Sequence, residues 1–270
     1  SSLYTVPTAI RIRGELSIER LQKSLTDVVS AHDVLRMEFH DDLGEPFAKV
    51  NDECNVVIEL QDLQEFDPVE REVELRRRVN ALVRQPISLS EAPLWKSVLL
   101  RIAPDDHVLL MTFHHILLDG WSLGILVRDL TNAYQDVSRE RENASGDVEV
   151  ASSEFDPSLL ETRYADYVAW QQQNDFAVDL EYWSEQLKGI PPFLELPGDK
   201  SRPAEQDFSG ATIHFRITKH ELDGFRQLGR DKGTTLFMTL LAAFVVLIYR
   251  YSGASDFAVG TPVANRSRAE

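Results

Sequence analysis

The stretch TFHHILLDGWS, residues 112–122, places His114 and His115 side by side and puts Asp119 four residues after the second histidine. An apolar run precedes the histidines, and a stretch with helical spacing begins after Gly120. Imidazole has an unperturbed pKa of about 6.5, so it can accept or donate a proton near neutral pH. The spacing therefore predicts a loop between a strand and a helix at which a proton can be transferred.

Neighbouring residues at the end of a strand point to opposite faces of the sheet. His114 and His115 are therefore not expected to act as two arms of one site, which argues against a metal centre formed by both imidazoles and Asp119. We expect one histidine to face a cavity and the other to pack behind it, holding the end of the strand through hydrogen bonds. The pattern predicts no bound metal.

Asp119 and Gly120 lie at the expected turn from strand to helix. A carboxylate there can anchor the loop, and a glycine lets the backbone bend sharply and lets a substrate approach it closely. The helix from Trp121 offers free N–H groups that favour a developing negative charge. This turn is therefore the candidate reaction site.

The same stretch lacks a persuasive protein nucleophile. Ser122 lies in GWSLG, which has the G-x-S-x-G spacing, but helical spacing begins at Trp121, so we interpret Ser122 as part of a helix and not as a nucleophile at a strand-to-helix elbow. Cys54 lies in ECNVVIEL, which is typical of a strand and has no histidine beside it. We therefore expect direct transfer between two bound substrates, with a histidine accepting or steering the proton. General-base help is worth about 10²- to 10⁴-fold, and holding two substrates together supplies roughly 7–11 kcal/mol, so on these magnitudes positioning is the larger effect.

Composition narrows the class of protein. The 270 residues are 43% hydrophobic and 27% charged, and 28 Lys and Arg against 44 Asp and Glu give a net charge of −16. A surplus of negative charge argues against nucleic acid or an anionic membrane as a partner. The single cysteine, Cys54, and the absence of a visible signal peptide favour a cytoplasmic location. The longest apolar run, 236–249, is short for a membrane span and predicts a buried core helix.

The rest of the chain predicts a mixture of strands and helices. Hydrophobic alternation predicts strands at 8–14, 35–39, 94–102, 107–113, 211–217 and 256–262. Helical spacing predicts helices after Ser17, at 68–84 with Val69, Val73, Val79 and Val83 on one side, at 121–135, near 164–170 and 176–183, after the Thr218–Glu221 capping box, and from Thr235. The strands at 94–102 and 107–113 should form a hairpin, with the second one buried on both faces. The polar segment 137–158 predicts a mobile loop.

These elements predict an α/β (α+β) fold. We place a first lobe at 1–190, a proline-rich crossing at 191–210 and the start of a second lobe at 211–270. The second lobe holds too few elements to close a core, so we expect it to be incomplete in this chain.

The stretch HHILLDGWS resembles the HHxxxDG signature of the condensation domains of nonribosomal peptide synthetases, a signature shared with chloramphenicol acetyltransferase. SAHDVLRMEF at 30–39 is similar to the family's RHExLRTxF stretch, and YADYVAW at 164–170 to its YxDYAxW stretch. Three later stretches follow in the family's order, namely LELPGDKSRP, TLFMTLLAAFVVLIYRYSG and VGTPVANR. The resemblance covers the chain from about Tyr4 to its last residue.

The resemblance implies a chloramphenicol acetyltransferase-like two-lobed fold, with the first lobe nearly whole. It implies that donor and acceptor peptidyl carrier domains deliver substrates on phosphopantetheine arms, beside a neighbouring adenylation domain, with no cofactor bound directly. An acceptor amine would attack the donor thioester with His115 at the reaction centre and Gly120 lining the channel. His114 would be structural, and Asp119 would pair with Arg36.

Some positions depart from the family's pattern: Ala31, Asp33 and Met37 stand where the family usually has Arg, Glu and Thr. They flank Arg36 without removing it. Three alternatives remain: an epimerization domain, a free-standing coenzyme A-dependent acyltransferase, and a non-catalytic docking domain. The GWS continuation and the later stretches favour condensation. The stretch YTVPTAIRIRGELS resembles domains that take L-configured donors, whereas ILLDGWS is typical of domains that take D-configured donors. We favour the L-configured donor.

Overall fold

The computed structural model describes residues 2–143, 162–198 and 210–263. The chain divides into two compact units, the first running to Asn174 and the second beginning at Asp175. The predicted crossing at 191–210 lies partly outside the described residues, and the predicted lobe boundary near residue 190 stays a prediction.

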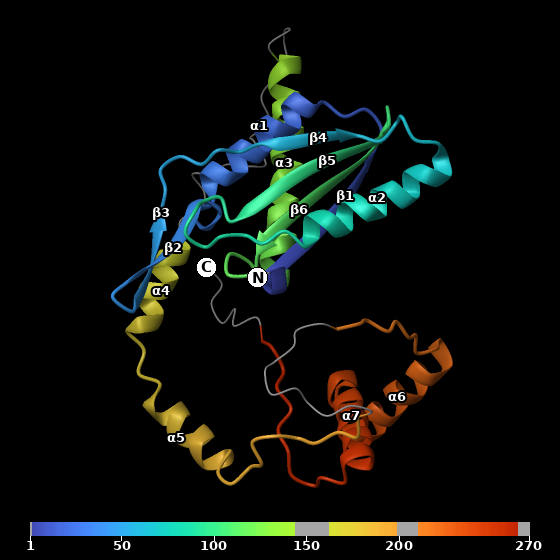
Figure 1. Ribbon diagram of the computed structural model, residues 1–270. Helices are drawn as coiled ribbons and strands as arrows, with labels where there is room; N and C mark the ends of the chain where they lie inside the picture. The colour runs from blue at the N-terminus through green and yellow to red at the C-terminus, as the bar shows by residue number, and fades with distance from the viewer. Residues whose placement is uncertain (1, 144–161, 199–209, 264–270) are drawn as a thin grey trace. The chain divides into compact units, whose positions relative to one another are not determined.

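The first unit is built around a four-stranded sheet with the strand order β1-β6-β5-β4 (Figure 1). Its strands are β1 (Thr5–Arg13), β4 (Ile58–Asp62), β5 (Trp95–Ala103) and β6 (Asp106–His114). The predicted hairpin is confirmed, because β5 and β6 are antiparallel neighbours. β1 also pairs antiparallel with β6, and Thr5 lies opposite His114. This register brings the segment before β1 beside the two histidines.

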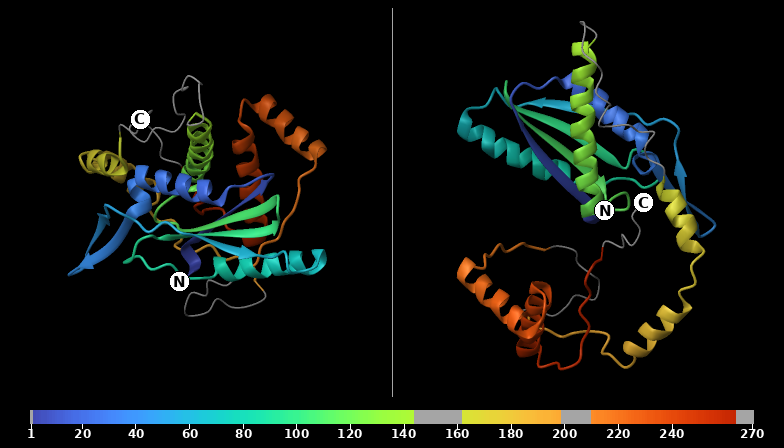
Figure 2. Two further views of the ribbon diagram at one scale, coloured as in Figure 1. Left: turned by 90° about the horizontal axis from the view of Figure 1, so that it is seen from above. Right: turned by 180° about the vertical axis from the view of Figure 1, so that it is seen from behind.

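Helices cover both faces of this sheet, as the left view of Figure 2 shows. The helices α1 (Ile18–Ala31) and α3 (Gly120–Asn143) pack on one face, and α2 (Pro68–Val83) packs on the other. Every residue of β6 between its two ends is buried, as predicted for a strand covered on both sides. Burial of each large apolar side chain stabilises the fold by roughly 1.5–3 kcal/mol, so His114 ends a firmly held strand and His115 follows it directly.

Smaller elements complete the first unit. A short 3₁₀ turn at Ser2–Tyr4 precedes β1, and another at Asp33–Arg36 follows α1. The strands β2 (Met37–Asp42) and β3 (Glu45–Val50) form a separate two-stranded sheet. The helix α4 (Tyr164–Gln172) is the last element before the second unit.

The second unit contains three helices among its described residues, namely α5 (Ala177–Gln186), α6 (Lys219–Lys232) and α7 (Leu236–Ser252). The predicted capping box at α6 is confirmed, since the Thr218 hydroxyl accepts from the Glu221 N–H and the Glu221 carboxylate accepts from the Thr218 N–H. Thr235 begins α7 as predicted, and its hydroxyl oxygen accepts from the Met238 N–H at 3.2 Å.

The predicted burial of this apolar helix is wrong for the part of the chain that the structure describes. Thr239 is the one buried residue of α7, although its sequence is LFMTLLAAFVVLIYRYS. The helix forms because its caps and side chains favour it locally, but burial requires other elements to cover it. The described residues of the second unit leave most of its side chains exposed.

Two predicted strands in the second unit are also wrong. Residues 211–217 and 256–262 have no regular secondary structure, and Ile213 and Phe215 are 86% and 85% exposed. A strand needs a hydrogen-bonded neighbour to satisfy its backbone, and no described residue pairs with either segment. Hydrophobic alternation alone therefore predicted strands that these segments do not form.

Other boundaries differ in the first unit. α3 continues to Asn143, so the start of the predicted loop at 137–158 is helical, and its part from 144 onward lies outside the described residues. β2 begins at Met37 because the chain turns at Asp33–Arg36. The strand β3 was not predicted, since its second residue is a proline.

The packed face of α2 agrees with the predicted one at Val79 and differs from it at the start of the helix. Val69 and Val73 are exposed, whereas Leu75, Val79 and Leu82 pack against the sheet. These three residues follow the i, i+4, i+7 spacing of a single helical stripe, which the first two valines do not share.

No single helix in the described ranges is long and apolar enough to cross a membrane. The helices α6 and α7 meet that criterion only together, by length and composition, as a pair bent by 106°.

Candidate functional site

The predicted site residues around the histidines lie on one loop between β6 and α3. This loop is a tight turn, in which the N–H of Leu117 donates to the carbonyl of His114 at 3.0 Å. His115 occupies the corner of that turn, and its backbone N–H donates to the carbonyl of Tyr4 at 2.7 Å. Leu117 and Leu118 are buried beneath it. The corner that carries His115 is thus fixed from both sides.

The two imidazoles have different environments. His114 is half-buried, its Nδ1 accepts from the N–H of Ile116 at 3.2 Å, and its ring lies 5.8 Å from the ring of Tyr4. Burial lowers the pKa of His114, and the neighbouring His115 lowers it further, so His114 is neutral near pH 7. His115 is exposed, and no described residue hydrogen-bonds its imidazole. The reactive role of His115 and the structural role of His114 stay predictions.

Asp119 holds the start of α3. Its carboxylate accepts from the backbone N–H of Ser122 at 2.8 Å and from the hydroxyl of Ser122 at 2.7 Å. Its carbonyl accepts from the N–H of Leu123 at 3.1 Å, so Asp119 is the N-cap of the helix. The N–H of Ser122 is therefore engaged by the protein's own carboxylate. The sequence predicted free N–H groups at this end of the helix, and for Ser122 that prediction is wrong.

The predicted pair between Arg36 and Asp119 is wrong. The Arg36 guanidinium donates to the Asp33 carboxylate at 2.6 Å and to the backbone carbonyl groups of Val29, Ser30, Asn51 and Asp52. Asp33 is one turn away in the same short 3₁₀ helix, and the carbonyl groups come from the end of α1 and the end of β3. Arg36 therefore joins the end of α1 to the segment after β3, and Asp119 caps α3.

Gly120 is exposed, and a Cβ built on it meets no atom within 4 Å. Its φ does not lie in the left-handed region, so the backbone here does not require glycine, contrary to the sharp bend predicted. The prediction that a substrate can approach Gly120 closely agrees with the structure, because no described atom beside Gly120 blocks the approach of another molecule.

His32 and Asp129 form a contact that sequence reasoning missed. His32 Nε2 lies 2.9 Å from Asp129 Oδ2, and their side chains are 19% and 8% exposed. Asp129 stands among Leu126, Leu130 and Ala133 on the buried face of α3. A carboxylate on an apolar helix face needs a partner, and this signal was available in the sequence.

Other reactive groups lie elsewhere or are not activated. Burial raises the pKa of the Cys54 thiol, so Cys54 is a poorer nucleophile than a free cysteine. Among the described residues no group of three or more His, Cys, Asp or Glu side chains is arranged to hold a metal ion.

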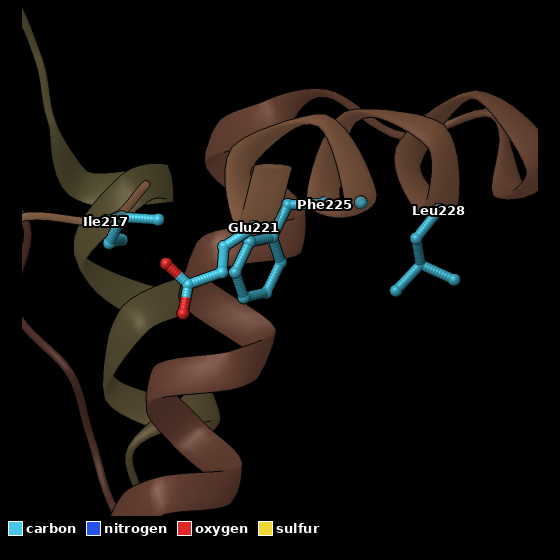
Figure 3. Close-up of a pocket in the computed structure, with 5 residues that line it drawn as sticks. Ile217, Glu221, Phe225 and Leu228 are labelled. Carbon is cyan, nitrogen blue, oxygen red and sulfur yellow. The ribbon is translucent and has the colours of Figure 1, made fainter. Parts of the chain in front are cut away.

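A pocket of about 540 Å³ lies along α6 in the second unit, away in sequence from the histidine loop. Figure 3 shows the side chains of Ile217, Glu221, Phe225 and Leu228 that line it. Its lining is mainly apolar, and the Glu221 carboxylate is held by Thr218 in the capping box. The pocket therefore offers no group free for chemistry.

A family model and the sequences of related synthetases assign this chain to one family. The family model described as "Condensation domain" matches residues 1–270. A linear gramicidin synthase of Brevibacillus parabrevis is 37% identical, over 100% of this chain and 5% of the synthase. Phosphinothricin tripeptide synthetase PhsC of Streptomyces viridochromogenes is 34% identical, over 99% of this chain and 24% of that protein. The chain thus spans a small part of these relatives.

Solved structures confirm the predicted fold class. The four-domain nonribosomal peptide synthetase AB3403 superposes with a TM-score of 0.79 at 24% identity, covering 98% of this chain and 19% of that one. SgcC5 of Streptomyces globisporus gives 0.73 at 25% identity, covering 98% and 58%. The X-domain from teicoplanin biosynthesis gives 0.74 at 25% identity, covering 92% and 53%.

Proposed function

The chain belongs to the condensation-domain family of nonribosomal peptide synthetases, and from this premise we propose that it forms an amide bond at the loop between β6 and α3. The observation that carries the proposal is the presentation of His115. Its imidazole is exposed, no described residue hydrogen-bonds it, and it stands at the corner of a turn fixed by Tyr4 and Leu117.

The proposed reaction joins two substrates that carrier domains hold on phosphopantetheine arms. The acceptor's amine nitrogen attacks the carbonyl carbon of the donor thioester, and the carbon–sulfur bond breaks as the amide forms. The amine loses a proton and the thiol leaving group gains one. The imidazole of His115 is the group proposed to take that proton or to orient the amine that loses it.

Gly120 supports the passage of such an arm. A slender chain that reaches His115 from the side of α3 must pass the start of that helix. The space beside Gly120 is open, because a Cβ at this position would meet no atom within 4 Å, and this accommodates the approach. Donor and acceptor carrier domains, and an adjoining adenylation domain, are the partners that the relatives' multidomain synthetases suggest.

A second candidate is a domain that recruits a partner without catalysis. The similarity to the teicoplanin X-domain favours it, because another solved structure contains an X-domain in complex with OxyB. The exposed His115 and the open space at Gly120 favour catalysis instead. The two candidates differ in whether the loop's side chains matter for product formation.

The test is a dipeptide-formation assay by intact-protein mass spectrometry on the complete domain, with donor and acceptor loaded on their carriers. Wild-type protein should transfer the donor to the acceptor carrier, and His115→Ala should lower the rate about 10²- to 10⁴-fold. No dipeptide in the wild type, despite correct loading, would overturn the proposal. Exchange of the donor α-proton with solvent would then indicate epimerization, and no exchange would indicate recruitment.

A further inference from the structure

The end of α1 contacts two other helices through adjacent residues, His32 and Asp33. His32 is the C-cap of α1, where its backbone N–H donates to the carbonyl of Val28 at 3.1 Å. Its imidazole lies 2.9 Å from the carboxylate of Asp129 in the middle of α3. Burial alone would raise the pKa of Asp129, but hydrogen bonds from His32 and Arg128 outweigh it and lower that pKa. Asp129 is therefore a buried carboxylate held ionised by its partners.

Asp33 contacts two arginines at once. One of its carboxylate oxygens accepts from Arg36 at 2.6 Å, and the other accepts from Arg163 at 2.9 Å. The side chains of Asp33 and Arg36 are 14% and 12% exposed, so this is a largely enclosed site. Arg163 is the N-cap of α4, and no residue of α4 is buried. The Arg163 side chain is 68% exposed, so its pair with Asp33 is a surface contact between the end of α1 and the start of α4.

We propose that His32 and Asp33 form a clamp that positions both α3 and α4 for the amide-forming reaction. This inference rests on the proposed function, because α3 begins directly after the loop that carries His115. Asp129 stands nine residues after Gly120, roughly 14 Å along the helix at 1.5 Å per residue. A helix moves as a rigid element, so a shift at Asp129 displaces the Asp119 cap and the turn beside it.

Directional contacts add to the positioning that the packed core provides. The apolar contacts between α1 and α3 supply most of the attraction between the two helices, and that attraction is non-directional. The enclosed His32–Asp129 contact favours one relative position of α1 and α3, and the Asp33–Arg163 pair adds a surface contact at the start of α4. Because a misplacement of about 1 Å can cost about 10² in rate, loss of such a contact should be measurable in catalysis.

The first experiment is a double-mutant cycle in the complete domain with loaded carriers. His32→Asn and Asp129→Asn should each lower kcat for dipeptide formation about tenfold without changing KM for the acceptor carrier. The double variant should be no slower than either single one, because the two residues act as one contact. Asp27→Asn is the matched control, since it breaks the exposed Lys23–Asp27 pair on the same helix and should leave kcat unchanged.

A second readout does not depend on activity. Hydrogen exchange should rise at residues 120–123 in His32→Asn and at residues 164–172 in Arg163→Ala, and neither should change in Asp27→Asn. Wild-type kcat in His32→Asn, additive losses in the double variant, or unchanged exchange in both segments would overturn the clamp. If wild-type protein forms no dipeptide, the proposed function fails, and the exchange measurement alone decides the clamp.

Discussion

In the first unit Phe113 has no exposed surface, whereas in the second unit Phe244 of α7 is 47% exposed. Both lie in strongly apolar stretches, and both stretches form the kind of element that suits them in the structure. The helix caps are also satisfied alike, by Ser17 in the first unit and by Thr235 in the second. The difference is that several elements converge on Phe113, while the described residues of the second unit leave α7 largely uncovered.

The contrast between the two units separates helix capping, which is local in sequence, from side-chain burial, which is not. A cap involves residues three positions apart, so it forms wherever its helix forms. Burial depends on segments distant in the sequence, so it is absent where those segments do not cover the helix. The candidate reaction loop belongs to the well-packed unit, which suits a site whose geometry must be maintained.

The largest expected effect concerns the two phenylalanines. Phe113→Ala should lower the free energy of unfolding by about 3–5 kcal/mol, because it leaves a cavity in a closed core. Phe244→Ala should cost less than about 1 kcal/mol, since that side chain is half exposed. Urea unfolding followed by circular dichroism measures both values. Equal losses would show that α7 is as well covered as β6 and would remove the contrast between the units.

The next effect separates Arg36 from Asp119 within the first unit. Arg36→Ala should cost about 3 kcal/mol, because it leaves the enclosed Asp33 carboxylate with a lost partner. Asp119→Ala should cost about 1 kcal/mol, the usual value of an N-cap. Since the two residues do not contact each other, the losses should add in the double variant. A double variant no less stable than Arg36→Ala would restore the direct pair between them.

Cap removal should affect both units alike. Ser17→Ala and Thr235→Ala should each cost about 1 kcal/mol, because each hydroxyl satisfies an N–H group that the helix leaves without a partner. Helix content and thermal unfolding report the two losses. A clear loss in one variant and none in the other would mean that capping depends on the packing of the unit around it.

The smallest expected effect is a pH dependence that a buried histidine of the first unit causes between pH 7 and pH 5. His107 is buried, and burial together with the nearby Arg101 lowers its pKa. The unfolded chain therefore binds a proton at a higher pH than the folded chain does, so stability is full above about pH 6.5 and falls as the pH is lowered. His114 acts in the same direction.

His107→Leu should therefore weaken the fall in stability between pH 7 and pH 5. His214→Leu is the matched control in the second unit, where the side chain is exposed, and it should leave the slope as it is in the wild type. Thermal unfolding at a series of pH values measures both slopes. An unchanged slope in His107→Leu would contradict the assignment to the buried histidine.

The sequence predicted what short spacing determines. The β5–β6 hairpin, the caps at Ser17 and Thr235, and the placement of the histidine loop between a strand and a helix all follow from residues near one another in the chain. The Asp119 cap is equally local, because the residues that it contacts begin three positions later, but it was not predicted, since Asp119 was assigned to Arg36.

What the sequence missed depends on tertiary contacts. Arg36 was assigned to Asp119 through the family resemblance, whereas the nearer Asp33 competes for the same guanidinium. The Asp129–His32 contact joins residues almost one hundred positions apart, and periodicity cannot pair such residues. The predicted strands at 211–217 and 256–262 failed for the same reason, since a strand is defined by its neighbour.

The most direct test of the reaction site compares Gly120→Ala with Gly124→Ala, one turn further along α3. A Cβ at either position meets no atom within 4 Å, and neither glycine has a left-handed φ, so both variants should fold with unchanged or slightly higher stability. In the dipeptide assay, Gly120→Ala should lose most of its rate because the methyl group enters the path to His115, and Gly124→Ala should retain it. A full rate in Gly120→Ala would contradict the assignment of the reaction to this loop.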